Sequence, residues 1–218
     1  MCKKALIFDM DGVIADTAPL HEEAWMQFCS NHQIQITSQQ FREELFGRSN
    51  KSTLKILLGK DLSKTDFHAL SNEKEKLYRK LATNQLLPLN GLVNFLQAAK
   101  KQNFKIAIAS SAHLENIIFT LDQTATSQFF NCITSSEEID NSKPHPEIFL
   151  KTALKLNVSP ENCFVFEDSF PGIESARKAE MKVVGLATTH SIETLPRTDL
   201  SIVDFSEIDL RKIKYLFG

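Results

Sequence analysis

Short apolar runs that alternate with helical patterns limit the folds open to this chain of 218 residues. The first run, Ala5–Phe8, is rich in branched residues and apolar on both faces, which predicts a buried parallel strand. Strands that alternate with helices favour an α/β fold in which a parallel sheet has helices on both faces. The other predicted strands are Lys105–Ala109, Asn131–Thr134, Cys163–Phe166 and Lys182–Leu186.

Amphipathic helices are predicted between the later strands, because apolar residues recur there at helical spacing. The patterns cover Gly91–Lys101, Pro146–Leu156 and Gly172–Glu180, and a proline suits the first turn of the second. Beyond the fifth strand, Val203 and Phe205 predict a last edge strand, which a final amphipathic helix follows. This tail carries no residues that point to chemistry.

The segment after the first strand breaks the alternation. From about Thr17 to Gln85 the chain has no convincing strand, and apolar residues such as Leu20, Ala24 and Phe28 recur at helical spacing. A helical insert of about seventy residues predicts a small second domain. We therefore expect residues 1–16 and 87–218 to form the α/β core, and residues 17–86 to form a small α-helical domain.

Composition excludes several classes of function. The formal net charge of -2 gives no general basic field, so we expect no nucleic-acid partner. No apolar run approaches the roughly 20 residues that span a bilayer, and Asp9 and Asp11 interrupt the first apolar stretch, so we expect neither a membrane partner nor a secretory signal. The scattered cysteines are typical of a cytoplasmic protein, and no obligate protein partner is evident.

Two carboxylates and a glycine follow the first strand. Asp9 and Asp11 lie one residue apart, so burying both charges requires a cation or a shared proton. In open α/β folds ligands bind at this carboxyl edge of the sheet. An ordinary Asp-Gly turn is the structural alternative, and this segment alone leaves it open.

Polar side chains also follow the next three strands. Ser110 and Ser111 follow the second strand, and Lys143 lies in the loop after the third. Glu167 and Asp168 follow the fourth strand. Because the carboxyl ends of parallel strands meet at one edge, we expect these side chains to lie close together.

This set of side chains suits Mg²⁺ together with a phosphate. Mg²⁺ prefers carboxylate, carbonyl and water oxygens, and a lysine and hydroxyls can hold the remaining phosphate oxygens. Each element has a structural alternative: the serines and the acidic segment can cap helices, and the lysine can be a solvated loop residue. Their appearance at successive strand ends favours the functional interpretation.

The four motifs Asp9-Met10-Asp11-Gly12, Ser110, Lys143 and Glu167-Asp168 together resemble those of the haloacid dehalogenase superfamily. The resemblance covers essentially the whole chain. It implies a Rossmann-like parallel sheet core with a helical cap domain inserted after the first strand, over residues 17–86. The segments Asp9–Trp25 and Ser142–Phe149 are similar to the subgroup that holds β-phosphoglucomutases and sugar-phosphate phosphatases.

The resemblance also implies a mechanism on a small phosphorylated metabolite. Asp9 is the expected nucleophile that forms an aspartyl phosphate, and Asp11 is the expected general acid and base. Mg²⁺ is expected to bind Asp9, the backbone carbonyl of Asp11, and Asp168, with Glu167 in or near its shell. A positive lysine, Lys143, is expected to bridge the nucleophile and the phosphate.

The phosphate is expected to rest on the segment after the second strand. Ser110, Ser111 and the backbone amides that follow are expected to hold a phosphate oxygen near the start of a helix. Lys143 completes this predicted phosphate site.

Whether water or a sugar hydroxyl accepts the phosphoryl group separates a phosphatase from a mutase. His21 and Lys74 stand at mutase-like positions, although they can also be solvated helix residues. Arg48 lies two positions earlier than the mutase arginine, and Leu114 replaces a mutase asparagine. We expect a phosphatase, with His21, Arg48 and Lys74 as candidate substrate contacts and a β-phosphoglucomutase or phosphohexomutase as the alternative.

A non-enzymatic phospho-receiver module is the remaining alternative, because it also combines a parallel sheet with aspartates, a hydroxyl and a lysine. Such a module needs neither an acid two residues after the nucleophile nor a helical insert. Asp11 and the insert therefore argue against it.

Overall fold

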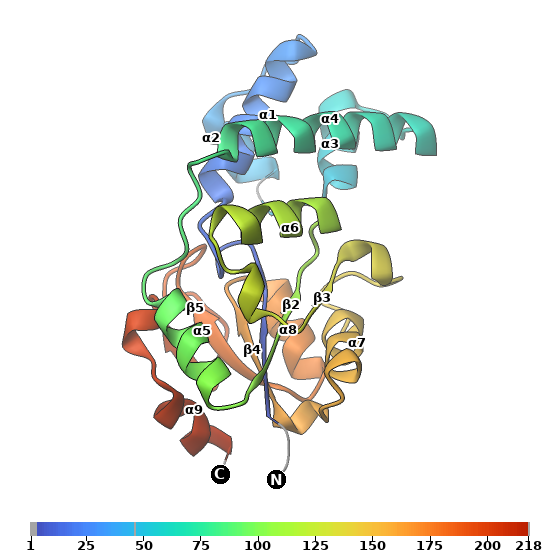
Figure 1. Cartoon of the computed structure of the whole chain (residues 1–218). Coiled ribbons are helices and arrows are strands. Elements are labelled where there is room, and N and C mark those ends of the chain that lie inside the picture. Colours follow the sequence, from blue (N-terminus) through green and yellow to red (C-terminus); the bar gives the residue numbers. More distant parts are fainter. Residues whose placement is uncertain (1–3, 46, 218) are drawn as a thin grey trace. The chain divides into compact units, whose positions relative to one another are not determined.

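The computed structural model describes residues 4–45 and 47–217 and contains a six-stranded parallel sheet (Figure 1). The strand order is β3-β2-β1-β4-β5-β6, so the first strand lies in the interior of the sheet. The predicted Rossmann-like α/β core is therefore confirmed. The strands are β1 (Ala5–Phe8), β2 (Lys105–Ala109), β3 (Cys132–Thr134), β4 (Cys163–Glu167), β5 (Lys182–Leu186) and β6 (Leu200–Ile202).

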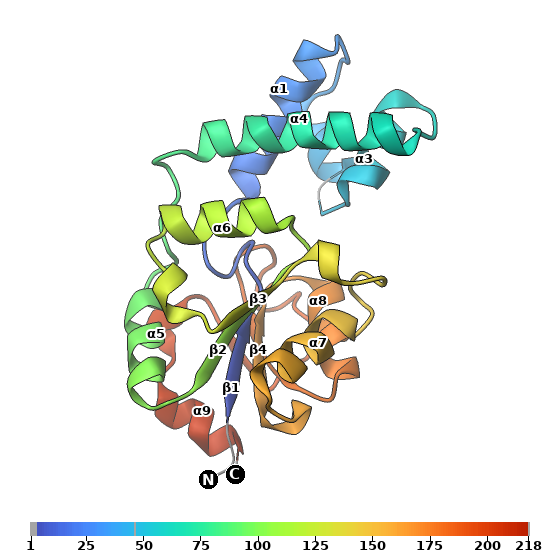
Figure 2. The same ribbon diagram turned by 45° about the vertical axis from the view of Figure 1, so that its right-hand side comes forward.

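Helices cover both faces of this sheet, as Figure 2 shows for α5 and α9 on one side and α7 and α8 on the other. Their bounds are α5 (Leu92–Lys101), α6 (Leu114–Gln123), α7 (Glu147–Leu156), α8 (Phe170–Lys178) and α9 (Leu210–Phe217). Short 3-10 turns lie at η2 (Ser127–Phe129), η3 (Ser136–Glu138), η4 (Pro160–Asn162) and η5 (Phe205–Glu207).

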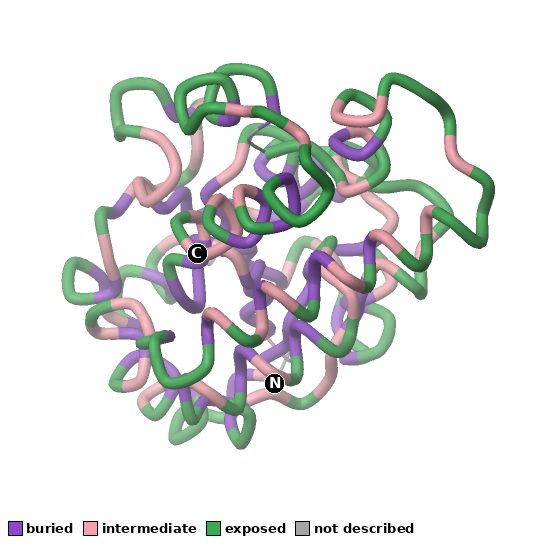
Figure 3. The backbone as a smooth tube through the Cα atoms, turned by 90° about the horizontal axis from the view of Figure 1, so that it is seen from above, coloured by how far each residue is buried: buried purple, intermediate pink, exposed green. Residues whose placement is uncertain are grey.

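The alternation of side chains along β1 divides the core into two apolar clusters. Leu6 and Phe8 join the cluster beneath α5 and α9, whereas Ala5 and Ile7 join the cluster beneath α7 and α8. A strand with two buried faces has to be apolar throughout, which explains why this run shows no polar alternation. Figure 3 shows the matching pattern in the helices, where buried positions recur beside exposed ones.

An aromatic stack fixes the register of the two central strands. The rings of Phe8 and Phe166 lie 4.5 Å apart and nearly parallel, and these residues are also paired in the sheet. Phe95 packs against both rings at close to a right angle. Because the register is fixed here, the residues that follow, Asp9 and Glu167, emerge side by side at the carboxyl edge.

The predicted last strand was wrong in position. The strand is Leu200–Ile202, whereas Val203 is 48% exposed and Phe205 begins a 3-10 turn. The backbone amide of Phe205 donates to the carbonyl of Asn90, and its ring joins the central aromatic stack. Phe205 is therefore apolar because it fills the core from a turn and not because it alternates in a strand.

The insert forms a second compact unit, Thr17–Gln85. Within it, buried side chains of α1, η1 and α3 form a separate apolar cluster: Trp25, Phe28, Cys29, Phe41, Leu45 and Leu54. None of the described helices in either unit is long and apolar enough to cross a membrane. The elements of the insert are α1 (Ala18–Asn31), α2 (Ser38–Gln40), the π-helical η1 (Phe41–Leu45), α3 (Asn50–Leu58) and α4 (Lys64–Ala82).

Candidate active site

The loop after β1 is a tight turn that carries both predicted catalytic aspartates. The amide of Asp9 donates to the carbonyl of Phe166 at 3.0 Å, which ties the end of β1 to β4. Gly12 has a φ of +70°, and a side chain there would overlap the carboxylate of Asp168. The segment therefore does form the Asp-Gly turn that the sequence analysis considered as an alternative to a functional site. The turn also places Asp11 beside the acidic loop after β4.

Lys143 reaches from the loop after β3 into the same site. Its Nζ lies 2.5 Å from Asp9 Oδ1 and 2.5 Å from Glu167 Oε1, and its side chain is 7% exposed. Burial lowers the pKa of Lys143, but the attraction of Asp9 and Glu167 outweighs it and holds the pKa above its ordinary value. The lysine is therefore a buried cation between two carboxylates and not a solvated loop residue.

Negative charge exceeds positive charge in this cluster. Burial raises the pKa of Asp9 well above its ordinary value; Lys143 lowers it, whereas Glu167, Asp11 and Asp168 raise it further. Burial and the neighbouring Glu167 also raise the pKa of Asp168 to about 7. A site that crowds carboxylates in this way is stabilised by a further cation with a preference for oxygen.

The donor set fits Mg²⁺, although the protein alone would not complete its shell. Among residues 4–45 and 47–217, no three His, Cys, Asp or Glu side chains are arranged to hold a metal ion by themselves. The predicted set requires only two carboxylates, from Asp9 and Asp168, together with the carbonyl of Asp11. Mg²⁺ commonly keeps several waters and binds substrate phosphate as well as one or two carboxylates.

Glu167 is committed to protein groups on both oxygens. Oε1 accepts from Lys143, and Oε2 accepts from the amides of Asp168 and Ser169 and from the Ser169 hydroxyl, each at 2.9 Å. Ser169 in turn caps α8 by accepting from the amide of Gly172. Glu167 is thus a buried anchor that orders the acidic loop.

The segment after β2 presents Ser110 at the same edge of the sheet. Ser110 is buried, its amide donates to Thr134 of β3, and its Oγ accepts from the amide of Ala112. Ser111 is exposed. Neither serine caps α6, because the helix begins at Leu114.

Glu137, a residue that the sequence analysis missed, binds the first backbone amide of α6. Its carboxylate accepts from the amide of Leu114 at 3.2 Å and from the Ser135 hydroxyl at 2.5 Å. Partial burial raises the pKa of Glu137, but hydrogen bonds from Ser135, His113 and Leu114 outweigh this and lower it. The first helical amide, which we expected near the phosphate, is therefore already paired with a carboxylate.

Two of the three candidate residues in the insert lie together. Lys74 Nζ is 2.8 Å from His21 Nδ1 and 3.0 Å from Glu75 Oε1, and the His21 ring stacks on Tyr78 at 3.9 Å. Lys74 is buried, so it is not the solvated helix residue considered as an alternative. Arg48 is exposed, and its Nε donates to a backbone carbonyl in its own segment.

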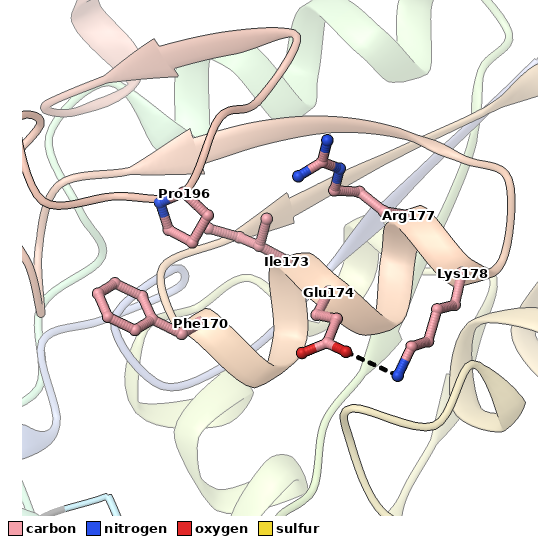
Figure 4. A pocket seen from close by; sticks show the side chains of 6 residues that line it. All are labelled: Phe170, Ile173, Glu174, Arg177, Lys178 and Pro196. Carbon is pink, nitrogen blue, oxygen red and sulfur yellow. Dashed lines mark ion pairs between the residues drawn. The ribbon is translucent and has the colours of Figure 1, made fainter.

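A pocket of the core lies beside α8. Figure 4 shows its lining, and its volume is about 450 Å³. Glu174 and Lys178 form an ion pair of 2.7 Å across it. None of the predicted catalytic residues lines this pocket: its lining consists of Phe170, Ile173, Glu174, Arg177, Lys178 and Pro196.

The loop after β5 holds two more functional candidates that the sequence analysis missed. Thr188 Oγ1 donates to the carbonyl of Gly12 at 2.6 Å, and Thr189 Oγ1 donates to Asp168 Oδ2. The rule that located the other site residues, a polar group after a strand of the parallel sheet, also applies to the predicted strand Lys182–Leu186. Applied once more, it would have found both threonines.

Comparison with known proteins places this arrangement in a family. The sequence matches the haloacid dehalogenase-like hydrolase family over residues 6–186. It is 34% identical to a β-phosphoglucomutase of Bacillus subtilis, over 84% of this chain and 83% of that protein. It is 32% identical to a phosphorylated carbohydrates phosphatase of Thermotoga maritima, over 87% of both.

Solved structures agree with the sequence relatives. A family IA, variant 3 hydrolase of Entamoeba histolytica superposes with a TM-score of 0.91 at 29% identity, over 98% of this chain and 99% of that one. A β-phosphoglucomutase of Clostridium difficile superposes with a TM-score of 0.83 at 31% identity, over 99% and 97%. The chain is therefore an enzyme that belongs to the haloacid dehalogenase-like hydrolase family.

Proposed function

We propose that this enzyme is a Mg²⁺-dependent phosphatase that hydrolyses a small sugar phosphate through an aspartyl phosphate on Asp9. The observation that carries the proposal is the bridge of Lys143 between Asp9 and Glu167, inside a cluster with an excess of carboxylates. A buried anion that must approach a phosphate of like charge needs such neutralisation. Relatives named as sugar-phosphate phosphatases support the substrate class.

The chemistry divides into two proton-balanced steps. A carboxylate oxygen of Asp9 attacks phosphorus, the bond to the leaving oxygen breaks, and Asp11 gives that oxygen its proton. Asp11 then takes a proton from water, whose oxygen attacks phosphorus and releases inorganic phosphate with Asp9 restored. Lys143 compensates the charge of Asp9 throughout.

Mg²⁺, when bound, would supply Lewis-acid neutralisation of the phosphoryl oxygens. We assign its protein ligands to Asp9, the backbone carbonyl of Asp11, and Asp168. Glu167 acts beside these ligands, because its oxygens bind Lys143 and the backbone of its own loop.

Substrate contacts complete the proposal. We assign Ser110 and Ser111, with Lys143, to the transferred phosphate. We assign residues 17–86 to the cap domain of the family, with His21, Arg48 and Lys74 as its candidate contacts to the rest of the substrate.

The first experiment measures phosphate release from p-nitrophenyl phosphate and from a panel of sugar phosphates. We expect Mg²⁺-dependent turnover that chelation removes and that Asp9→Asn abolishes. Asp11→Asn should slow turnover far more than it weakens Mg²⁺ binding. Full activity of Asp9→Asn, or full activity in excess chelator, would falsify the mechanism.

A mutase is the second candidate, because a β-phosphoglucomutase is among the relatives and His21 and Lys74 lie together at mutase-like positions. Leu114 and the position of Arg48 favour hydrolysis. The deciding assay supplies β-glucose 1-phosphate with a catalytic amount of glucose 1,6-bisphosphate. Glucose 6-phosphate that appears faster than inorganic phosphate would establish the mutase and overturn the phosphatase.

A further inference from the structure

Two adjacent threonine hydroxyls after β5 connect three loops of the active site. Thr188 Oγ1 donates to the carbonyl of Gly12 at 2.6 Å, in the loop that carries Asp9 and Asp11. Thr189 Oγ1 donates a short hydrogen bond to Asp168 Oδ2, in the loop after β4. Thr188 Oγ1 is also 3.4 Å from the same Oδ2. The loops after β1, β4 and β5 thereby meet at one carboxylate oxygen.

The packing around this carboxylate leaves it little freedom. A side chain at Gly12 would overlap Asp168 Oδ2 and come to 3.0 Å from Thr188 Oγ1, so all three residues are in close contact. Asp168 is also 4% exposed. The orientation of this carboxylate is therefore set by its contact with Gly12 and by the hydroxyls of Thr188 and Thr189.

We propose that Thr188 and Thr189 form a hydroxyl clamp that positions Asp168 and the Gly12 turn for the metal ion of the proposed function. Glu167 and Asp11 repel the Asp168 carboxylate, so without a donor it would be expected to turn away from the cluster. Hydrogen bonds to an ionised oxygen are strong enough to oppose this. Because Thr189 donates to Oδ2 while Thr188 holds the Gly12 carbonyl, the other oxygen of Asp168 is left for the ion.

The clamp makes Thr188 and Thr189 positioning residues, which act through Asp168 and the Gly12 carbonyl. The groups that orient metal-binding side chains commonly contribute about 10–100-fold to metal affinity. The inference rests on the proposed function for the presence of the ion. It goes further by assigning a role to a loop that the predicted site did not include.

The test compares Thr189→Val, which keeps the shape and removes the hydroxyl, with Thr189→Ser, which keeps the hydroxyl. The probe is Mn²⁺, followed through the electron paramagnetic resonance signal of the free ion, with Mg²⁺ added as competitor and no substrate present. We expect Thr189→Val to weaken binding about 10–100-fold and Thr189→Ser to stay within about threefold of the wild type. Thr194→Val is the matched control, because the Thr194 hydroxyl in the same loop bonds to Ser191 and to no other residue that the structure describes.

Wild-type affinity in Thr189→Val would overturn the clamp, and so would equal losses in Thr189→Val and Thr189→Ser, because the affinity would then not depend on the hydroxyl. Should Thr189→Val fail to fold in chelator by circular dichroism, Thr189→Ala takes its place with the same criterion. Wild-type protein that binds Mn²⁺ but hydrolyses no phosphate ester would overturn the proposed function and leave the clamp standing. Wild-type protein that binds no Mn²⁺ or Mg²⁺ would overturn both.

Discussion

The core and the insert each bury a lysine among polar side chains, but they balance its charge differently. In the core, Lys143 lies between Asp9 and Glu167, and further carboxylates adjoin it. In the insert, Lys74 is 3.0 Å from the carboxylate of Glu75 and 2.8 Å from His21.

In the insert, the lysine and the carboxylate beside it carry opposite charges. Glu75 Oε1 also accepts from Asn50 at 2.6 Å, and Lys74 lies over the ring of Trp25 at 5.2 Å. One cation and one anion with hydrogen bonds to neighbours need no outside ion. The core cluster has an excess of anions, so it is stabilised by a cation that the chain does not supply. The difference marks the core cluster as the one that is built for a cation.

The largest effect is expected from Lys143→Met. It leaves Asp9 and Glu167 buried without their cation, so the free energy of unfolding should fall by about 3–5 kcal/mol. Phosphate release should fall roughly 10²–10³-fold. Denaturant unfolding in chelator and steady-state turnover measure the two effects.

Lys151→Met is the control for this prediction. Lys151 pairs with Glu147 at 2.9 Å, but its side chain is 42% exposed, so Lys151→Met should lower the free energy of unfolding far less than Lys143→Met does. Equal losses of stability in the two variants would show that burial of the lysine does not matter in the core.

The second prediction concerns the lysine and the carboxylate of the insert. Lys74→Met should lower the free energy of unfolding by about 3 kcal/mol, because it removes the cation beside the buried carboxylate of Glu75. Combining Lys74→Met with Glu75→Leu should recover most of this loss. Equilibrium unfolding of both single variants and the double variant measures the coupling.

The corresponding core pair should behave differently. Lys143→Met with Glu167→Leu removes a cation and an anion, but Asp9 also loses its cation, and the amides of Asp168 and Ser169 lose their acceptor. The double variant should therefore stay as unstable as Lys143→Met or become less stable. If the double variant in the core recovered as much stability as the double variant in the insert, the proposed difference between the two clusters would be wrong.

The sequence predicted much of the core site, because the topology of the sheet determines which strand ends lie together. Parallel strands bring their carboxyl ends together whatever the loops between them do, so Asp9 and Lys143 could be placed together across 134 positions of sequence. The same reasoning placed Glu167 and Asp168 correctly at the edge. It could not show that Glu167 would bind the backbone of its own loop, since that depends on the local path of the chain.

Packing decided what the sequence could not. Lys74 and Glu75 lie in a run of charged residues that is typical of a solvated helix face, yet both are buried in the fold, where α4 packs on α1 and α3. Phe205 is apolar like a strand residue but fills the core from a turn. Glu137 is an ordinary polar residue of a 3-10 turn until the fold brings the amide of Leu114 within hydrogen-bond distance.

The third prediction concerns a smaller effect and tests the proposed Mg²⁺ site directly. Mg²⁺ at about 100 times its dissociation constant should stabilise the wild type by about 2.7 kcal/mol. For a chain of this length, this raises the melting temperature by roughly 5–10 °C. Differential scanning calorimetry should show this rise in Glu75→Gln but not in Asp168→Asn. A rise of equal size in Asp168→Asn would remove Asp168 from the metal ligands.

The smallest effect is expected at the exposed edge of the core, where Glu147 restrains the loop that leads to Lys143. Glu147 accepts from the amides of Asp140 and Asn141 at 3.0 Å, and the Asp140 amide is the largest cause that lowers its pKa from 4.5 to about 2. A carboxyl whose pKa is depressed in the folded state contributes its full stabilisation above its unfolded-state pKa. This contribution is lost as the pH falls through the folded-state pKa.

The free energy of unfolding of the wild type should therefore exceed that of Glu147→Gln by a constant amount from about pH 7 to about pH 5. The difference should then shrink as the pH falls through about 2 and vanish only below that, where Glu147 is protonated in both states. Because the group lies at the surface, solvent screening keeps the difference far below that for Lys143→Met. A difference that persisted undiminished to the lowest pH would assign the restraint to hydrogen bonding and not to charge.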